Sequence, residues 1–238
     1  MPEIKTIWLD NPPVNAISQA VTEYLWAELE DLGDARVVVL RGKGDRAFSA
    51  GADISGFGGL EEGDRPAGIT PLAEFMERLP VPVVAAIHGY CLGGGLEVAL
   101  GADIRIATAD AQFGFPEVKL GLLPGGGGTQ RAPRLVGAGR AAWLIMSGER
   151  IPAERALQWG LIEALVEDLD AGIEEIAGTL AKQSPHAIRQ IKELLAATRE
   201  APDYEREFAA FAACLQSEDG QEGIAAFFEK REPSWTGR

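Results

Sequence analysis

The sequence predicts an α/β protein whose sheet is covered by helices, and two patterns carry this prediction. Residues 4–9, 18–33 and 36–40 show strand-like, helical and strand-like patterns in turn. Residues 81–87 form another apolar, β-branched run, which glycines and a helical pattern follow. Apolar strands that alternate with amphipathic helices are typical of a sheet covered by those helices.

The first elements have well-marked ends. The strand at residues 4–9 stops at a strong turn signal, the Asp-Asn-Pro-Pro of residues 10–13. Ser18 is placed to cap the next helix, which ends at Gly33. The apolar residues of this helix recur at helical spacing: Val21, Leu25, Leu29 and Leu32.

The most informative stretch is residues 82–131. Its strand turns through Gly89 into three consecutive glycines, Gly93, Gly94 and Gly95, and residues 96–100 have a helical pattern. Such a turn exposes backbone N–H groups at the positive end of a helix, where no side chain blocks a ligand. It is suited to bind an anion or a developing oxyanion, although glycine clusters also serve ordinary turns.

Two glutamates accompany this turn in the sequence. Glu97 stands on the first turn of the predicted helix, and Glu117 follows Pro116. Paired carboxylates near a polarising backbone site suit acid–base chemistry on a carbonyl compound, because one accepts a proton while the other gives one. Taken alone, each glutamate is equally compatible with a structural role, at a helix dipole or in a solvated turn.

A second accessible segment covers residues 47–57. It contains the small residues Ser49, Ala50, Gly51 and Ala52. The carboxylate of Asp53 is suited to fix a turn by accepting backbone N–H bonds. Taken alone, this segment favours a structural loop over a site.

The acidic, glycine-rich residues 58–70 are expected to border a pocket, and residues 71–79 to form a helix.

The rest of the chain is mainly helical in pattern. Helices are predicted over residues 127–136, 140–146 and 152–159, with a late strand within residues 160–166. From residue 184 the pattern is helical throughout, and Ser217 is placed to cap the last helix. Its apolar stripes are Ile188, Ile191, Leu194 and Leu195, then Phe208, Phe211, Ala212 and Leu215, then Ile224, Phe227 and Phe228. These stripes are expected to join the core or to cover a neighbouring subunit. Trp143 and Trp159 are expected in the core, and His88 as a structural histidine.

Composition limits the classes of function. The 238 residues are 46% hydrophobic and 24% charged, which predicts one globular unit with at most one appended subdomain. No apolar run is long enough to span a bilayer and the first residues lack a signal pattern, so a cytoplasmic protein with no membrane partner is expected. Cys91 and Cys214 form no CxxC pair and there are two histidines, which gives a metal site little support. The net charge of −14 disfavours a nucleic-acid partner.

Three linked motifs together are highly specific. They are AFSAGADI at residues 47–54, VAAIHGYCLGGGLEVALGADIRIA at 84–107 and FGFPEVKLGLLPGGGGTQR at 113–131. In this order and at these spacings they resemble the crotonase superfamily, the enoyl-CoA hydratase/isomerase fold. The resemblance extends from NPPVNAIS at residues 11–18 to EGIAAFFEKREP at 222–233.

The resemblance implies a spiral of ββα units over residues 1–183 and a C-terminal helical oligomerisation region over residues 184–238. It also implies a homotrimer or a homohexamer, built as a dimer of trimers. Phe227 and Lys230 match positions that reach coenzyme A bound at an adjacent subunit. The turn at residues 12–14 lacks the basic residue that relatives often carry there, which leaves the phosphate contacts open.

The resemblance further implies hydration of a trans-2-enoyl-CoA to a 3-hydroxyacyl-CoA, with no metal and no cofactor beyond the coenzyme A of the substrate. The backbone N–H groups of Ala50 and Gly94 would form the oxyanion hole, Glu97 would help to activate water, and Glu117 would give a proton to the α-carbon. The implied coenzyme A contacts are Ala52, Asp53, Ile54, Phe227 and Lys230. The implied acyl-pocket residues are Pro116, Leu122, Pro124 and Gly125.

Other readings stay open at this point. Double-bond isomerisation or hydration of a branched or aromatic acyl-CoA would use the same scaffold. Having carboxylates at both positions favours hydration. A non-catalytic acyl-CoA-binding protein is opposed by the intact glutamate pair, and an RNA-binding member by the net charge.

Overall fold

The computed structural model describes residues 3–55, 68–183, 185–197, 211–212, 215–231 and 233. The predictions for residues 58–67, for Phe208 and Cys214, and for the side chain of Leu194 lie outside this part. Five strands form a parallel sheet in the order β1-β2-β4-β6-β9. Their bounds are β1 Glu3–Leu9, β2 Ala35–Gly42, β4 Val83–Ile87, β6 Ile104–Ala107 and β9 Ala164–Leu165.

A second sheet of four strands runs in the order β3-β5-β7-β8, with only β8 antiparallel to its neighbour. Its strands are β3 Ala47–Ser49, β5 Tyr90–Leu92, β7 Gln112–Gly114 and β8 Arg150–Pro152. Strands β3, β5 and β7 each follow directly on β2, β4 and β6 of the first sheet, and a helix follows each pair. This repeated order is the predicted series of ββα units.

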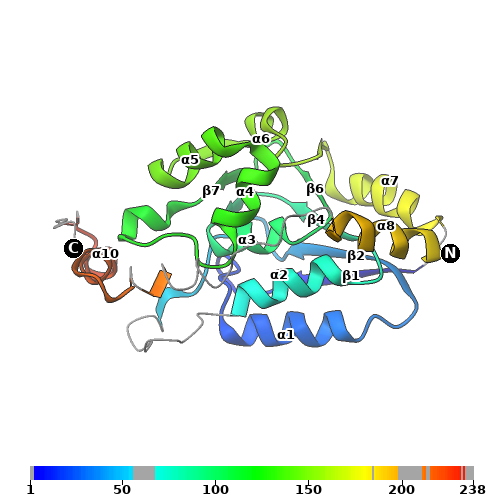
Figure 1. Cartoon of the computed structure of the whole chain (residues 1–238), viewed down its shortest axis with the longest axis horizontal. Helices are drawn as coiled ribbons and strands as arrows, with labels where there is room; N and C mark the ends of the chain where they lie inside the picture. Colours follow the sequence, from blue (N-terminus) through cyan, green and yellow to red (C-terminus); the bar gives the residue numbers. More distant parts are fainter. Residues whose placement is uncertain are drawn as a thin grey trace.

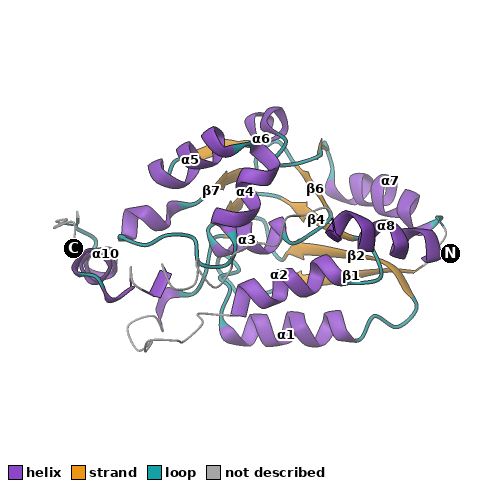
Figure 2. Cartoon of the chain, in the orientation of Figure 1, coloured by secondary structure: helices purple, strands orange, loops and turns teal. Residues whose placement is uncertain are grey.

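Helices surround the sheets, as Figures 1 and 2 show. Those of the repeated units and the connection before them are α1 Gln19–Glu30, α2 Ile69–Arg78, α3 Gly94–Leu100, the 3₁₀ helix η3 Pro116–Leu120 and α4 Gly128–Val136. The later ones are α5 Ala138–Ser147, α6 Ala153–Trp159, α7 Leu169–Ala181, α8 Pro185–Ala197 and α10 Glu218–Glu229. None of the helices that the structure describes has the length and apolar character needed to cross a bilayer.

Both faces of the five-stranded sheet are buried, which explains the continuous apolar run in β2. Val38 and Leu40 belong to the larger core, together with residues of α1, α2 and α3. Val37 and Val39 point to the other face and pack with residues of α7, such as Leu169 and Ala177. Since successive side chains of a strand point to opposite faces, a sheet covered on both sides needs apolar residues at every position.

Local capping agrees with the predictions at two helices. The Ser18 hydroxyl accepts a hydrogen bond from Val21 N at the start of α1, and Ser217 Oγ accepts one from Gly220 N at 2.9 Å in α10. The helix predicted over residues 152–159 begins one residue later, at Ala153. Pro152 is the last residue of β8 and the N-cap residue of α6. The predicted helices and strands otherwise lie within a few residues of the observed ones.

The predicted apolar stripe of α8 does not lie in the core of the single chain. Ile191 and Leu195 are 50% and 57% exposed. Lys192 instead faces inward, and its Nζ donates to Met76 O, Val81 O and Asp103 Oδ2 at 3.2, 3.0 and 2.7 Å. The lysine therefore turns the helix so that part of its apolar stripe faces outward.

The expectation that Trp143 lies in the core is also wrong. Its side chain is 44% exposed, and its ring meets that of the partly buried Trp159 edge to face, with centroids 5.9 Å apart. Trp143 is one of the apolar residues of α5, of which Ala141 and Leu144 are the buried ones. The inward face of α5 is therefore filled by smaller side chains than the tryptophan.

Helices α8 and α10 lie at opposite ends of the molecule (Figure 1). Helix α8 is beside α7 and α2, whereas α10 packs closely on η3: a Cβ at Gly223 would lie only 1.9 Å from Leu120 O. The division of the chain at residue 183 stays a prediction.

Candidate active site

A cavity of about 590 Å³ lies where β3, β5, α3 and η3 meet, with Phe211 and a residue of α10 on its border. Ten of the residues predicted for the site line it. They are Ala50, Ala52, Ile54, Gly94, Glu97, Pro116, Glu117, Leu122, Gly125 and Phe227. The motifs that lie far apart in the sequence are thus brought together in one place.

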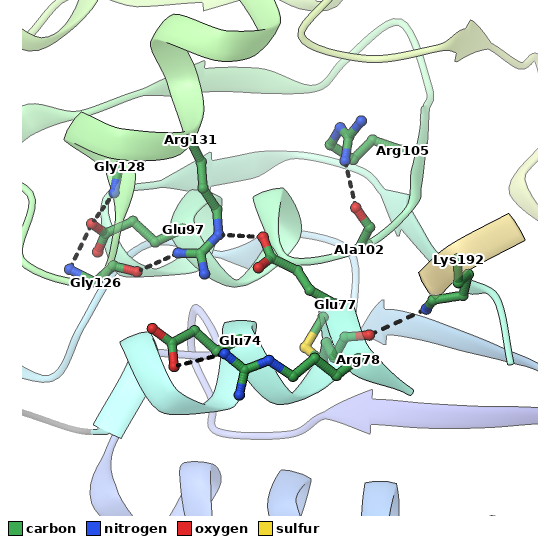
Figure 3. A network of polar contacts seen from close by, with 11 residues as sticks. Glu74, Glu77, Arg78, Glu97, Ala102, Arg105, Gly126, Gly128, Arg131 and Lys192 are labelled. Atoms are coloured by element: carbon green, nitrogen blue, oxygen red, sulfur yellow. Dashed lines mark hydrogen bonds and ion pairs between the residues drawn. The ribbon is translucent and has the colours of Figure 1, made fainter. Parts of the chain in front are cut away.

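Glu97 is a buried carboxylate held by backbone groups. Its position in the first turn of α3 places it on the cavity wall, where it is only 2% exposed. Gly126 N and Gly128 N donate to its Oε1 at 2.7 and 2.9 Å (Figure 3). Hydrogen bonds from two N–H groups stabilise a carboxylate in a fixed orientation, which suits a general base.

Glu117 approaches the glycine turn from η3. A Cβ at Gly93 would lie 2.7 Å from Glu117 Oε1, so the carboxylate is in contact with the backbone of this turn. Gly93 has a φ of +49°, which favours glycine for a second, independent reason. Since Gly93 also precedes α3, on which Glu97 stands, both carboxylates border the same turn.

The expectation that Ala50 supplies an oxyanion-hole N–H is wrong. Ala50 N donates to Val14 O at 2.9 Å and is therefore already engaged. Ala52 fits better, because it forms a parallel bridge with Ile17 in which Ile17 N donates to Gly51 O and Asp53 N donates to Ile17 O. In such a bridge the N–H of Ala52 itself points away from Ile17.

Gly94 faces the N–H of Ala52. A Cβ at position 94 would lie 3.1 Å from Ala52 N, and both residues line the cavity. Gly94 is the first residue of α3, so its own N–H has no partner within the helix. The structure therefore brings two backbone N–H groups together at one wall of the cavity, close to both glutamates.

Three predicted residues are not part of the cavity wall: Asp53, Pro124 and Lys230. Asp53 Oδ1 accepts a hydrogen bond from Ser55 N at 3.0 Å. Hydrogen bonds from the Ser55 side chain and from Ser55 N lower the pKa of the Asp53 carboxyl. Asp53 thus fixes its own turn. Pro124 packs behind the wall, where its side chain would meet a Cβ at Gly128, and Lys230 is the exposed residue that ends α10. The coenzyme A contacts assigned to Asp53 and Lys230 stay predictions.

Several lining residues were missed by the sequence analysis. Tyr90 and Arg150 lie on the four-stranded sheet, and the Arg150 guanidinium stacks on the Tyr90 ring at 4.9 Å from its centroid. Strand alternation from Leu92 would have found Tyr90, since both point to the same face. Phe211 closes against Gly125, where a Cβ would lie 2.7 Å from its ring. No local signal joins residues so distant in sequence.

The part of the chain described by the structure contains no cluster of three or more His, Cys, Asp or Glu side chains able to hold a metal ion. At the glycine turn, two carboxylates and two backbone N–H groups converge in a cavity that Tyr90, Lys119 and Arg150 also line. This arrangement can polarise a carbonyl oxygen while protons are moved at neighbouring carbons.

Comparison with curated proteins gives relatives that match along nearly their whole length. A probable enoyl-CoA hydratase of Bacillus subtilis (strain 168) is 40% identical over 249 residues, which cover 98% of this chain and 95% of that protein. A carnitinyl-CoA dehydratase of Salmonella typhimurium is 38% identical over 251 residues, covering 99% and 95%.

Solved structures agree with these relatives. An enoyl-CoA hydratase from Bacillus anthracis has a TM-score of 0.79 and 38% identity, covering 100% of this chain and 97% of that chain. A carnitinyl-CoA hydratase from Mycobacterium avium has a TM-score of 0.85 and 34% identity, covering 99% and 95%. The model of the family Enoyl-CoA hydratase/isomerase matches residues 2–238. With its ββα units and its paired glutamates at a glycine turn, the chain belongs to the enoyl-CoA hydratase/isomerase family and has the crotonase fold.

Proposed function

We propose that the protein is an enoyl-CoA hydratase that adds water across the 2,3 double bond of a trans-2-enoyl-CoA. The observation that carries this proposal is the pair Glu97 and Glu117 at one glycine turn, next to the N–H groups of Ala52 and Gly94. Hydration needs a group that takes a proton from water and a group that gives a proton to carbon. Two carboxylates in one cavity meet that need.

The proposed reaction uses these groups together. Ala52 N–H and Gly94 N–H donate to the thioester oxygen and stabilise the negative charge that develops there; loss of one such donor costs about 3–4 kcal/mol in comparable sites. Glu97 takes a proton from the attacking water, whose oxygen bonds to the β-carbon. Glu117 gives a proton to the α-carbon, and the product is a 3-hydroxyacyl-CoA. No redox cofactor enters this reaction, because hydration exchanges no electrons with another molecule. We assign no step to a metal, because the two N–H groups polarise the thioester carbonyl and the two carboxylates move the protons.

Isomerisation of a 3-enoyl-CoA is the second candidate, because the family description names both activities. An isomerase moves a proton between two carbons, which a single carboxylate can do. The second carboxylate in the cavity, that of Glu117, therefore favours hydration. The relatives named for carnitinyl-CoA make that thioester a further candidate substrate.

The direct test is the loss of conjugated thioester absorbance when purified protein is mixed with crotonyl-CoA, with product mass measured in parallel. Rapid loss together with the mass of one added water, abolished in Glu117→Gln, supports the proposal. The matched control is Glu154→Gln, which changes an exposed glutamate on α6 and should react at the wild-type rate. Turnover of a 3-enoyl-CoA without hydration of crotonyl-CoA would identify an isomerase instead.

We also propose that the chain assembles as a homotrimer or a homohexamer. Support comes from large apolar side chains that the single chain leaves exposed on its C-terminal helices, namely Ile191, Leu195, Phe227 and Phe228. Phe227 is 54% exposed although it lines the cavity, so a neighbouring subunit at α10 would help to close the site. Sedimentation that gave only monomers at assay concentration would contradict this assembly.

A further inference from the structure

A buried ion pair between Arg131 and Glu77 lies close to Glu97 (Figure 3). Arg131 on α4 donates from Nε to Glu77 Oε1 on α2 at 2.8 Å. The Arg131 side chain is 3% exposed and that of Glu77 is 13% exposed. Burying two charges carries a large desolvation cost, and apolar residues of similar size often stabilise a fold equally well. Stability alone is therefore a weak reason for this pair.

Arg131 also holds the loop that binds Glu97. Its Nη1 donates to Gly126 O at 3.1 Å, while Gly126 N and Gly128 N donate to Glu97 Oε1 (Figure 3). Gly126 is thus bonded on one side to the arginine and on the other side to the carboxylate. The contacts form one continuous series from Glu77 through Arg131 and Gly126 to Glu97.

The backbone of the glycine loop is intrinsically flexible, and two side chains outside it hold it: Thr70 Oγ1 donates to Gly125 O at 3.1 Å, and Arg131 Nη1 donates to Gly126 O. Residues 125–128 are all glycine, and Gly127 has a φ of +106°, so the backbone is intrinsically free to take many conformations. Larger residues are not an alternative, since a Cβ at Gly126 would lie 2.5 Å from Glu97 Oε2. The loop must stay bare to approach the carboxylate, and an outside contact must restrict it.

We propose that Arg131 and Glu77 are positioning residues for Glu97: they lock the glycine loop in the conformation that aims its two N–H groups at Oε1. The inference rests on the proposed hydratase function for its kinetic consequence. A shift of about 1 Å in a catalytic group can cost on the order of a hundredfold in rate, so a loosened loop should lower kcat. Substrate binding should change less than kcat, because neither Arg131 nor Glu77 lines the cavity and, of the loop, only Gly125 and Gly126 do.

The chain offers a matched control in Arg105 on β6. This arginine is also 3% exposed, pairs with Glu163, and donates to Leu161 O and Ala102 O at 2.9 and 2.8 Å. Arg131→Met and Arg105→Met therefore both remove a buried, paired guanidinium that also binds backbone carbonyls. Only the first should disturb the loop at Glu97.

The first experiment compares the kinetics and melting temperatures of these two variants with crotonyl-CoA. Arg131→Met should lose at least about tenfold in kcat with KM within about twofold of wild type. Arg105→Met should keep kcat even where its melting temperature falls as far. Equal loss of kcat in both variants, or none in Arg131→Met, would overturn the proposal. Should Arg131→Met fail to fold, Glu77→Gln is used in its place, with the same expected loss of kcat.

A second measurement does not depend on the reaction. Amide hydrogen exchange in a peptide that covers residues 124–130 should become faster in Arg131→Met and stay unchanged in Arg105→Met. Arg131→Lys, which keeps the charge but not the paired donors, should be intermediate. Unchanged exchange in Arg131→Met contradicts the positioning role. A wild-type protein with no hydratase activity but the expected exchange would instead contradict the proposed function.

Discussion

Gly93 and Glu117 are in contact at the centre of the site: a Cβ at position 93 would lie 2.7 Å from Glu117 Oε1. The same glycine adopts φ +49° and begins the turn that carries the N–H of Gly94. One residue thus sets the approach of the carboxylate and the direction of a backbone donor. Substitution here should affect the chemistry more than the overall fold.

Gly93→Ala is accordingly expected to lower kcat by at least about tenfold, since the methyl group would push Glu117 aside and strain the turn. Steady-state kinetics with crotonyl-CoA measures the effect. Gly139→Ala on α5 is the matched control, because no atom lies within 4 Å of the position its Cβ would take. The control should be active and slightly more stable, by about 0.5–1 kcal/mol. Wild-type activity in Gly93→Ala would show that Glu117 does not need this contact.

Glu97→Gln is expected to lower kcat by at least about a hundredfold. The amide oxygen can still accept the N–H groups of Gly126 and Gly128, so the loop should keep its shape while the base is lost. Circular dichroism and a melting curve close to those of wild type would establish that the variant is folded. A folded Glu97→Gln with near-normal turnover would remove Glu97 from the mechanism.

Features that depend on neighbouring residues can be predicted from this sequence, whereas features that depend on distant contacts cannot. Local signals, such as the Ser18 cap or the apolar runs of β2 and β4, depend on neighbouring residues and were read correctly. The glutamate pair and Gly94 came from motifs, and the structure brings them together at the cavity. Predictions were wrong where the structure depends on contacts between residues far apart in the sequence. The pairing of Ile17 with Ala52, and of Val14 with Ala50, decides which N–H groups face the cavity.

Helix α8 shows the same limit in packing. Its apolar stripe predicted which side faces inward, but three acceptors from distant parts of the chain bind Lys192 and turn part of that stripe outward. A lysine can be buried when its ammonium group is paired and hydrogen-bonded, as that of Lys192 is. Hydrophobic periodicity has no means of anticipating such acceptors.

Gly223→Ala is expected to disturb the active site from α10. The new Cβ would lie 1.9 Å from Leu120 O, so α10 and η3 must separate, and η3 carries Glu117. We expect a lower kcat and a lower melting temperature. The matched control is Gly178→Ala on α7, where a Cβ would meet its first neighbour at an ordinary 3.7 Å and helix propensity should improve. Equal, unimpaired activity in both variants would show that α10 does not position η3.

His88 should make the fold sensitive to mild acid. Burial lowers the pKa of its imidazole, outweighing the opposite effects of Asp110, Asp45 and the Gly44 carbonyl, while Arg41 lowers it further. A histidine whose pKa is lower in the folded chain than in the unfolded chain does not change the free energy of unfolding well above pH 6.5. As pH falls below 6.5 the unfolded chain takes up a proton that the folded chain resists, and stability declines until the folded pKa is passed.

His88→Gln should therefore flatten the fall in unfolding free energy between pH 7 and pH 5, measured by urea denaturation at several pH values. Asp110 acts in a separate pH range. Burial raises the pKa of its carboxyl, but hydrogen bonds from Thr108, from Gly89 N and from its own backbone N–H, together with the nearby His88, lower it overall. The contribution of Asp110 to the free energy of unfolding is therefore lost only below about pH 3.8. Between pH 7 and pH 5 Asp110 stays ionised, so the difference between the two proteins in this range reports the titration of the imidazole. A slope in His88→Gln equal to that of wild type would mean that the imidazole titrates alike in the folded and unfolded chains.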